Sequence, residues 1–392
     1  MKYWRGFIVA AALAVLTWAL TQFAAAHSAL VDMIYPYASR LIQDFLAGWS
    51  AQASFCLWQM LVIVMVVMLL ASIIIMIILR WNFVQWLGWV LSGVCLIWCL
   101  HTGIYGLNQY SSPLSEDIRL TMDPDITTTD LINTTTYFRD EANKLAVQVP
   151  RNATGRVEIG SFQQVAEQAG DGFYNLVFEK NYAVFAGSRT PVKELGWADM
   201  YTSMGITGVT MPLTGEAAVN PQIPAVALPF TICHEMAHRM CIAPEDDANF
   251  AAFLASTNNS DLVYQYSGYF MAFRYCYNAL ASIPTTTASA AANRILEGLD
   301  PYLRADLDHY RAYYTAVLDD GATKVANTVN DAYLQASGDE DGVKSYGQVT
   351  DLLCSWHWQE IYLPLHADDE TEDVFDPLDK NDVFNPEATE GE

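Results

Sequence analysis

Basic residues are scarce in this chain. Lysine and arginine together number 20, against 44 aspartates and glutamates, and the formal net charge at pH 7 is -24. A protein that binds nucleic acid needs cations against the backbone phosphates, so this balance argues against nucleic acid as a partner. The chain has 392 residues, which is enough for a membrane region and one sizeable soluble domain.

Paired cysteines are also lacking in the soluble part of the chain. Its cysteines are Cys233, Cys241, Cys276 and Cys354, and no two of them form a CxxC pair. If Cys233 and Cys241 lie on one continuous helix, they are about 12 Å apart along its axis. That separation exceeds the reach of a disulfide, so these two do not pair unless the helix breaks between them; other pairings stay open.

Charge is absent from one whole stretch, "LWQMLVIVMVVMLLASIIIMIIL" at residues 57–79. A run of ~20 apolar residues matches the hydrocarbon thickness of a bilayer, so it predicts a transmembrane helix. Apolar runs at 7–26 and 83–107 predict two more, and the latter is rich in tryptophan, as expected at a membrane interface. Residues 1–107 are therefore predicted to form a membrane anchor with three transmembrane helices, and the lipid bilayer is an expected partner.

The run at 7–26 has a second interpretation. It follows Lys2 and Arg5 and ends in the small residues of "FAAAHSA", so it could be a cleaved signal peptide. We favour a retained span because the apolar stretch is longer than most signal-peptide cores.

The few basic residues predict the orientation. Lys2 and Arg5 precede the first span and Arg80 lies between the second and third, so the positive-inside rule places both points in the cytoplasm. Three spans then carry everything after Leu107 to the outside. Arg40, in the loop between the first two spans, is an exception to the rule. The sequence predicts a multi-pass protein of the cell membrane with an extracytoplasmic soluble domain.

Residues 108–366 are predicted to fold as one mainly helical domain with a small β-sheet. Threonine-rich capping signals begin a helix in "TTTDLINTTTYFRDEANKLAVQV", and "FYNLVFEKNYAVFAG" is predicted to be helical too. The segment "MGITGVTMPLTGEAAVN" has near-alternating glycine, threonine and valine, which predicts a short strand or hairpin. Helices are predicted from Pro229 onwards.

Residues 367–392 change character. They are acidic, with Lys380 as the single basic residue, and this composition predicts a disordered tail. The segments "DVFDP" and "DVFNP" echo each other within it. The tail is interpreted either as an ordinary solvated segment or as the carrier of two docking motifs.

The segment "HEMAH" at residues 234–238 has the form HExxH. On a helix, positions i and i+4 share a face, so His234 and His238 can reach one cation while Glu235 leans towards the same site. This pattern predicts a zinc ion with a third protein ligand and one position left for water. The competing interpretation is two core histidines beside an exposed glutamate, but burying two histidines is costly without a metal or hydrogen-bond partners.

The third ligand is expected in "CIAPEDDANFAAFLAST". Acids in the first turn of a helix are favoured by the helix dipole, so capping alone could explain residues 245–247. At ~100° per residue, however, Glu245 borders the alanine-lined face of that helix, which permits close approach of the HExxH helix, whereas Asp247 points nearly the opposite way. The predicted zinc ligands are His234, His238 and Glu245, with Asp247 as the alternative to Glu245.

The segment "EDDAN" resembles the ExxAN-type segment that follows HExxH in zinc peptidases of gluzincin type, where the first glutamate completes the metal site. A closer resemblance covers nearly the whole chain before the tail. The three apolar runs with "GITGVTMPLTGEAAVN", "PFTICHEMAHRMCIAPEDDANFAAFLA", "YSGYFMAFRYCYNAL" and "VNDAYLQASGDEDGVKSYGQVTDLL" resemble the bacterial membrane proteins grouped as domain of unknown function 3810. The resemblance implies a zincin-like metallopeptidase domain. Two positions depart from that family: Cys241 stands where it tends to have glycine, and Asp247 where it tends to have glutamate.

A zinc hydrolase also needs groups that stabilise the oxyanion of its tetrahedral intermediate. The segment "YQYSGYFMAFRYCYNAL" supplies Tyr266, Tyr269 and Arg274 as candidate catalytic residues. The alternative is a helix whose tyrosines pack in the core. By analogy with other zinc peptidases, "GEAAVN" is expected to be an edge strand that pairs with an extended peptide.

The HExxH motif lies outside every long apolar run and is followed by charged residues, which argues against an intramembrane protease. The predicted function is a membrane-anchored, zinc-dependent peptidase that hydrolyses extracytoplasmic peptide or protein substrates. Glu235 would take the proton of the attacking water while zinc polarises the peptide carbonyl. The alternative function is a non-catalytic membrane-anchored binding or scaffold protein, which has no need of a base at Glu235.

Overall fold

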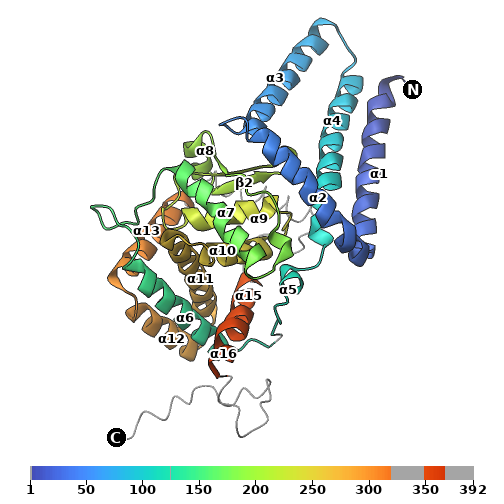
Figure 1. Ribbon diagram of the computed structural model, residues 1–392. Coiled ribbons are helices and arrows are strands. Elements are labelled where there is room, and N and C mark those ends of the chain that lie inside the picture. The colour runs from blue at the N-terminus through green and yellow to red at the C-terminus, as the bar shows by residue number, and fades with distance from the viewer. Residues whose placement is uncertain (1, 124, 319–347, 367–392) are drawn as a thin grey trace, which may run out of the picture.

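The structure is a computed structural model that describes residues 2–123, 125–318 and 348–366. Three long helices project from a mainly helical globular part that holds a small sheet (Figure 1). The predicted acidic tail at 367–392, with its two short repeats, lies outside the described residues.

Three helices are long and apolar enough to cross a membrane: α1 (Arg5–Ala26), α3 (Leu57–Ile78) and α4 (Phe83–Ile104). They match the three predicted spans, although α4 ends before Leu107 and gives way to a short 3-10 helix, η2 (Gly106–Tyr110). The N-terminus and the α3–α4 turn lie at one end of the molecule, and the globular part lies at the other (Figure 1). If the three helices each cross a bilayer, the N-terminus and the α3–α4 turn must lie on one side of it and the globular part on the other.

Helix α1 packs closely on α4. A side chain at Gly6 would meet the backbone of Gly88 at 2.4 Å, so the missing side chains let the two backbones touch. The Ser92 hydroxyl donates to the Gly6 carbonyl at 2.7 Å across this contact. Helix α3, by contrast, buries only Gln59.

The segment between α1 and α3 was expected to be a loop, but it forms helix α2 (Ser28–Ser50). Helix α2 runs from the end of α1 to the base of α3 beside the globular part (Figure 1). On one face, Arg40 Nε donates to the Met240 carbonyl at 3.3 Å and Gln43 donates to the Pro212 carbonyl at 3.1 Å. The other face exposes apolar side chains at helical spacing: Leu30, Met33, Ile34, Tyr37, Leu41, Phe45 and Trp49. Such a two-faced helix fits the boundary between a bilayer and a protein domain.

The remaining helices form the globular part. They are α5 (Leu114–Asp117), α6 (Thr128–Ala146), α7 (Phe162–Phe178), α8 (Ala198–Ser203), α9 (Leu228–Arg239), α10 (Glu245–Thr257), α11 (Leu262–Ser282), α12 (Thr286–Glu297), α13 (Pro301–Leu318), α15 (Gln348–His357) and α16 (Leu363–His366), with a short 3-10 turn at η3 (Ala183–Phe185) and a π-helical turn, η5 (Trp358–Tyr362), before α16. Another 3-10 turn, η1 (Lys2–Trp4), lies outside the globular part and leads into α1. As predicted, α6 begins at a threonine-rich capping signal, because Thr127 and Asp130 form a reciprocal capping box. The helix predicted in "FYNLVFEKNYAVFAG" stops at Phe178, and only the turn at Ala183–Phe185 follows.

The sheet has three strands in the order β1-β3-β2: β1 (Lys193–Glu194), β2 (Gly208–Met211) and β3 (Glu216–Val219). Strands β2 and β3 form the predicted antiparallel hairpin, and β1 pairs with β3 in parallel. The expectation that "GEAAVN" is an edge strand was wrong, because β1 covers the second edge of β3. Within the described sheet the edge strand of the hairpin is β2.

Glu216 of β3 ties the sheet to the membrane helices. Its two carboxylate oxygens accept from the backbone N–H groups of Leu57 and Trp58 at 2.8 Å, and Lys193 pairs with it at 2.7 Å. An acid at a helix N-terminus satisfies donors that have no partner within the helix. The start of α3 is therefore fixed on the same sheet that packs against the HExxH helix.

Candidate metal centre

Helix α9 carries the HExxH motif through the middle of the globular part. Pro229 lies in its first turn, and every residue of the helix except His234 is buried. The helix ends at Arg239, and the chain then turns sharply, because Cys241 takes a left-handed φ of 73°. This conformation favours glycine, so a cysteine here is less favourable than glycine would be. Cys233 and Cys241 are both free thiols in this structure.

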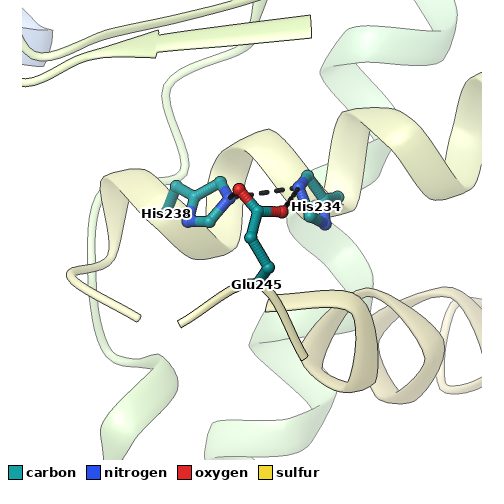
Figure 2. A group of neighbouring side chains, drawn as sticks. All are labelled: His234, His238 and Glu245. Atoms are coloured by element: carbon teal, nitrogen blue, oxygen red, sulfur yellow. Dashed lines mark hydrogen bonds and ion pairs between the residues drawn. The ribbon is translucent and has the colours of Figure 1, made fainter. Parts of the chain in front are cut away.

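The sharp turn brings the first residue of α10 back against α9. Figure 2 shows Glu245 reaching up between the two histidine rings. The Nε2 atoms of His234 and His238 are 3.1 Å apart, and Glu245 oxygens lie 3.4 Å from the first and 3.6 Å from the second. One ligand atom from each side chain thus lies within 4.8 Å of the others.

These distances can be compared with the demands of a zinc ion. Donors at about 2.0–2.1 Å in a tetrahedron stand about 3.3–3.4 Å from one another. The Nε2–Nε2 separation of 3.1 Å is near that spacing, and each histidine Nε2 has one of the two Glu245 oxygens at 3.4 or 3.6 Å. Two imidazoles and a carboxylate are also a donor set that zinc takes in hydrolytic sites, with a fourth position open. The residues present therefore fit a zinc ion.

The hydrogen bonds of His238 support the same orientation. Its Nδ1–H donates to the Ile242 carbonyl at 2.9 Å, which leaves the lone pair of Nε2 facing His234 and Glu245. Without a metal, burial lowers the pKa of His238, but the Glu245 carboxylate outweighs burial and raises that pKa to about 9. His238 in turn keeps the pKa of Glu245 below its usual range, against the effect of burial.

Glu235 lies on the same helix beneath strand β2. Only 5% of the residue is exposed, and its Oε2 accepts from the Thr210 hydroxyl at 2.7 Å. Gly208 makes this approach possible, because a side chain there would lie 2.3 Å from Glu235 Oε1. Burial raises the pKa of Glu235. The prediction that this glutamate would be an exposed bystander of two core histidines is therefore the weaker interpretation.

Asp247, the alternative ligand, faces the other side of α10. Its Oδ2 accepts from the backbone N–H of Leu114 at 3.0 Å, at the start of α5. Burial, and then the charge of Asp246, raise its pKa to about 7. The structure thus gives Asp247 a local bond to the chain leaving the membrane helices and brings Glu245 to the histidines.

The three candidate catalytic residues on α11 lie in different surroundings. The Tyr266 hydroxyl donates to Asp306 at 2.7 Å in the interior, and Tyr269 packs edge-on against Phe253 and Tyr137. Neither lines the cavity beside His234, whereas Arg274 does. The physical reason is helical periodicity: Tyr269 and Arg274 are five residues apart, which is a rotation of about 140°.

Further residues near the three candidate metal ligands were not among the predicted catalytic residues. Thr210 bonds Glu235, and the Tyr275 hydroxyl donates to Asn249 at 3.0 Å. Asn249 follows Glu245 by one helical turn in the "EDDAN" segment, a spacing that the sequence displays. Tyr310 and Tyr314 also line the cavity, but they come from α13, and no local pattern links that helix to α9.

Comparison with known proteins finds one family. Residues 31–354 match the family described as protein of unknown function (DUF3810), which covers most of the chain, including α2 and the last two membrane helices. No curated protein and no solved structure matches the chain significantly. The chain therefore belongs to the DUF3810 family, as its sequence resemblance indicated.

Proposed function

We propose that this protein is a membrane-anchored, zinc-dependent peptidase. The observation that carries the proposal is the convergence of His234, His238 and Glu245, whose ligand atoms lie within 4.8 Å of one another, with Glu235 buried beside them. A carboxylate in that position has no part in holding the metal. Such a carboxylate can act as a general base that accepts a proton from the attacking water.

A zinc ion bound there would supply Lewis acidity, both to a peptide carbonyl and to the attacking water. Glu235 Oε2 would accept the proton of that water and then deliver it to the leaving amine nitrogen. The Thr210 hydroxyl, bonded to the same oxygen, holds the carboxylate in one orientation. Because burial raises the pKa of Glu235, this carboxylate is closer to the range in which a group both takes and returns a proton near neutral pH.

The substrate chain would lie along β2. This strand is the free edge of the hairpin, and Gly208 and Thr210 on it contact the Glu235 side chain. An extended peptide can pair with such an edge through its backbone, which places a scissile carbonyl by register rather than by side-chain identity. Strand β3, for which the sequence predicted this role, lies between β1 and β2 and has no free edge in the described sheet.

The site would act on substrates close to the membrane surface. Glu216 joins the sheet to the start of α3, and α2 connects the globular part to the apolar helices. With the N-terminus and Arg80 in the cytoplasm, the globular part would be extracytoplasmic. The substrates would then be extracytoplasmic peptides or the membrane-proximal parts of proteins.

The test of this function is Glu235→Gln in the full-length protein. The change keeps the size of the side chain and its bond to Thr210 but removes the proton acceptor, so hydrolysis of a peptide library should fall about 10²–10⁴-fold. Zinc content and thermal stability should stay near those of the unchanged protein. If the zinc-loaded protein cleaves nothing, and Glu235→Gln behaves identically in cells, the scaffold alternative replaces the peptidase.

A further inference from the structure

A cavity of about 640 Å³ opens directly beside the metal-binding side chains. His234 of α9 and Asn249 of α10 form its wall on the metal side, and residues of α11 and α13 form the opposite wall. Its described lining contains no aspartate or glutamate, and Arg274 is its single permanently charged side chain. In a chain with 44 acids and 20 basic residues, a cavity with this balance is selective for anions.

Arg274 forms no ion pair with any described residue. Its guanidinium carbon lies 4.9 Å from the ring centroid of Tyr275 and 4.7 Å from that of Tyr310, so both rings make cation–π contacts with it. Its buried Nε has no hydrogen-bond partner in the described part of the chain. Arg274 as a whole is only partly buried and lines the cavity, so an anionic ligand there can supply the partner that the described part of the fold does not.

Arg151, which contacts the same helix α11, shows what a structural arginine looks like in this protein. It pairs with Asp306 through two bonds of 3.2 and 2.9 Å, and Tyr266 donates to the same carboxylate. All charges in that cluster are compensated within the fold. Arg274 lacks such a carboxylate partner, which indicates that its partner is an external ligand.

We infer that Arg274 binds a carboxylate of the substrate in this cavity, beside the metal-binding side chains. Arginine pairs with carboxylates through two parallel bonds, and the tyrosine, asparagine and threonine groups of the lining offer further donors. The carboxylate would be either the C-terminus of a peptide or the side chain of an aspartate or glutamate. The inference rests on the proposed peptidase function for the peptide nature of its ligand. It gives Arg274 a substrate-binding role in place of the oxyanion role predicted from sequence.

The experiment measures binding to the full-length, zinc-loaded Glu235→Gln protein by calorimetry, so that turnover does not interfere. Three matched pentapeptides are used: a neutral peptide with a free C-terminus, the same peptide amidated, and an amidated peptide with one glutamate. At least one carboxylate-bearing peptide should bind about 10- to 100-fold more tightly than the neutral amide. Which of the two is preferred identifies the source of the carboxylate.

In Arg274→Gln, the ratio of the affinity for the carboxylate-bearing peptide to that for the neutral amide should fall close to one. Arg274→Lys should keep part of this preference. Asn278→Asp is the variant least able to disturb folding, because Asn278 is exposed on the rim of the cavity; the added negative charge should also abolish the preference. Arg311→Gln is the matched control, since Arg311 also lies over a tyrosine, Tyr277 at 5.6 Å, but does not line the cavity, and it should keep the preference.

Equal affinities for the three peptides would overturn the inference, as would a preference that survives both Arg274→Gln and Asn278→Asp, or the absence of any binding. The proposed hydrolysis is measured separately with zinc-loaded protein that carries Glu235. Cleavage of acid and amide peptides at equal rates would refute the carboxylate site and leave the peptidase standing. Selective binding without cleavage would refute the peptidase and leave the carboxylate site standing.

Discussion

Glu245 and Asp247 stand two residues apart in the first turn of α10, but they face two different regions of the molecule. Glu245 lies between two imidazoles, which keep its pKa below the usual range against the effect of burial. Asp247 faces the start of α5, where burial and Asp246 raise its pKa to about 7. Two carboxyl groups in one turn of a helix thus have pKa values shifted in opposite directions, because they face different neighbours.

The difference shows what a helix N-terminus can and cannot determine. The helix dipole favours both acids equally within one turn. Their roles are set by what the neighbouring segment presents: on one side the ring nitrogens of α9, on the other a single backbone N–H at Leu114. The sharp turn at Cys241 is what brings α10 against α9 in the orientation that favours Glu245.

The largest expected effect separates the two acids directly. Glu245→Ala should weaken zinc binding by more than about 100-fold, because even residues that only orient a ligand contribute 10- to 100-fold. Asp247→Ala should change zinc affinity only a few-fold, and it should cost about 1–3 kcal/mol of stability by leaving the Leu114 N–H without its acceptor. Competition with a chelating dye measures the affinities. The reverse pattern would move the third ligand to Asp247.

A second substitution tests the position of Glu235 without changing any of the three candidate metal ligands. Gly208→Ala places a methyl group 2.3 Å from the present position of Glu235 Oε1, so the carboxylate must move. A displacement of about 1 Å can cost on the order of 10²-fold in rate, so peptide hydrolysis should fall 10- to 100-fold while zinc content is kept. Gly48→Ala is the control, because nothing lies within 4 Å of its added carbon. Unchanged hydrolysis by Gly208→Ala would mean that Glu235 does not act from its observed position.

The smallest expected effect concerns Asp247 and the pH dependence of the stability of the protein. The pKa of Asp247 is about 7 in the folded protein, above its ordinary value of 3.8. The folded state therefore binds the extra proton between these values, and this contribution to stability is lost as pH rises through about 7. Relative to Asp247→Asn, the unchanged protein should lose on the order of 1–2 kcal/mol between pH 5 and pH 8. Parallel stability curves for the two proteins would show that this carboxyl is not buried as described.

Local patterns predicted much of the fold and the grouping of His234, His238 and Glu245. The apolar lengths of α1, α3 and α4, the capping box at Thr127 and the i, i+4 spacing of the histidines are all properties of one short segment. Helical rotation was one of the reasons to prefer Glu245 over Asp247, and the structure brings Glu245 to the histidines.

The features that were missed depend on contacts between distant segments. Helix α2 was not foreseen because its apolar stripe is interrupted by polar residues that bind the globular part, such as Arg40 and Gln43. The position of β3 within the sheet depends on β1, which pairs with it across more than twenty residues. Tyr266 resembled a catalytic residue in sequence, but Asp306 from α13 takes its hydroxyl, and no local signal reveals that partner.

X-ray absorption at the zinc edge, on the full-length protein purified without added chelator, tests the central claim most directly. The account predicts one zinc per chain, bound by two imidazole nitrogens at about 2.0–2.1 Å and carboxylate or water oxygens, with no sulfur ligand. The signal should disappear in the double variant His234→Ala, His238→Ala. A protein that stays free of zinc after reconstitution, or that binds it through thiolates, would contradict the assignment of His234, His238 and Glu245 as a metal centre.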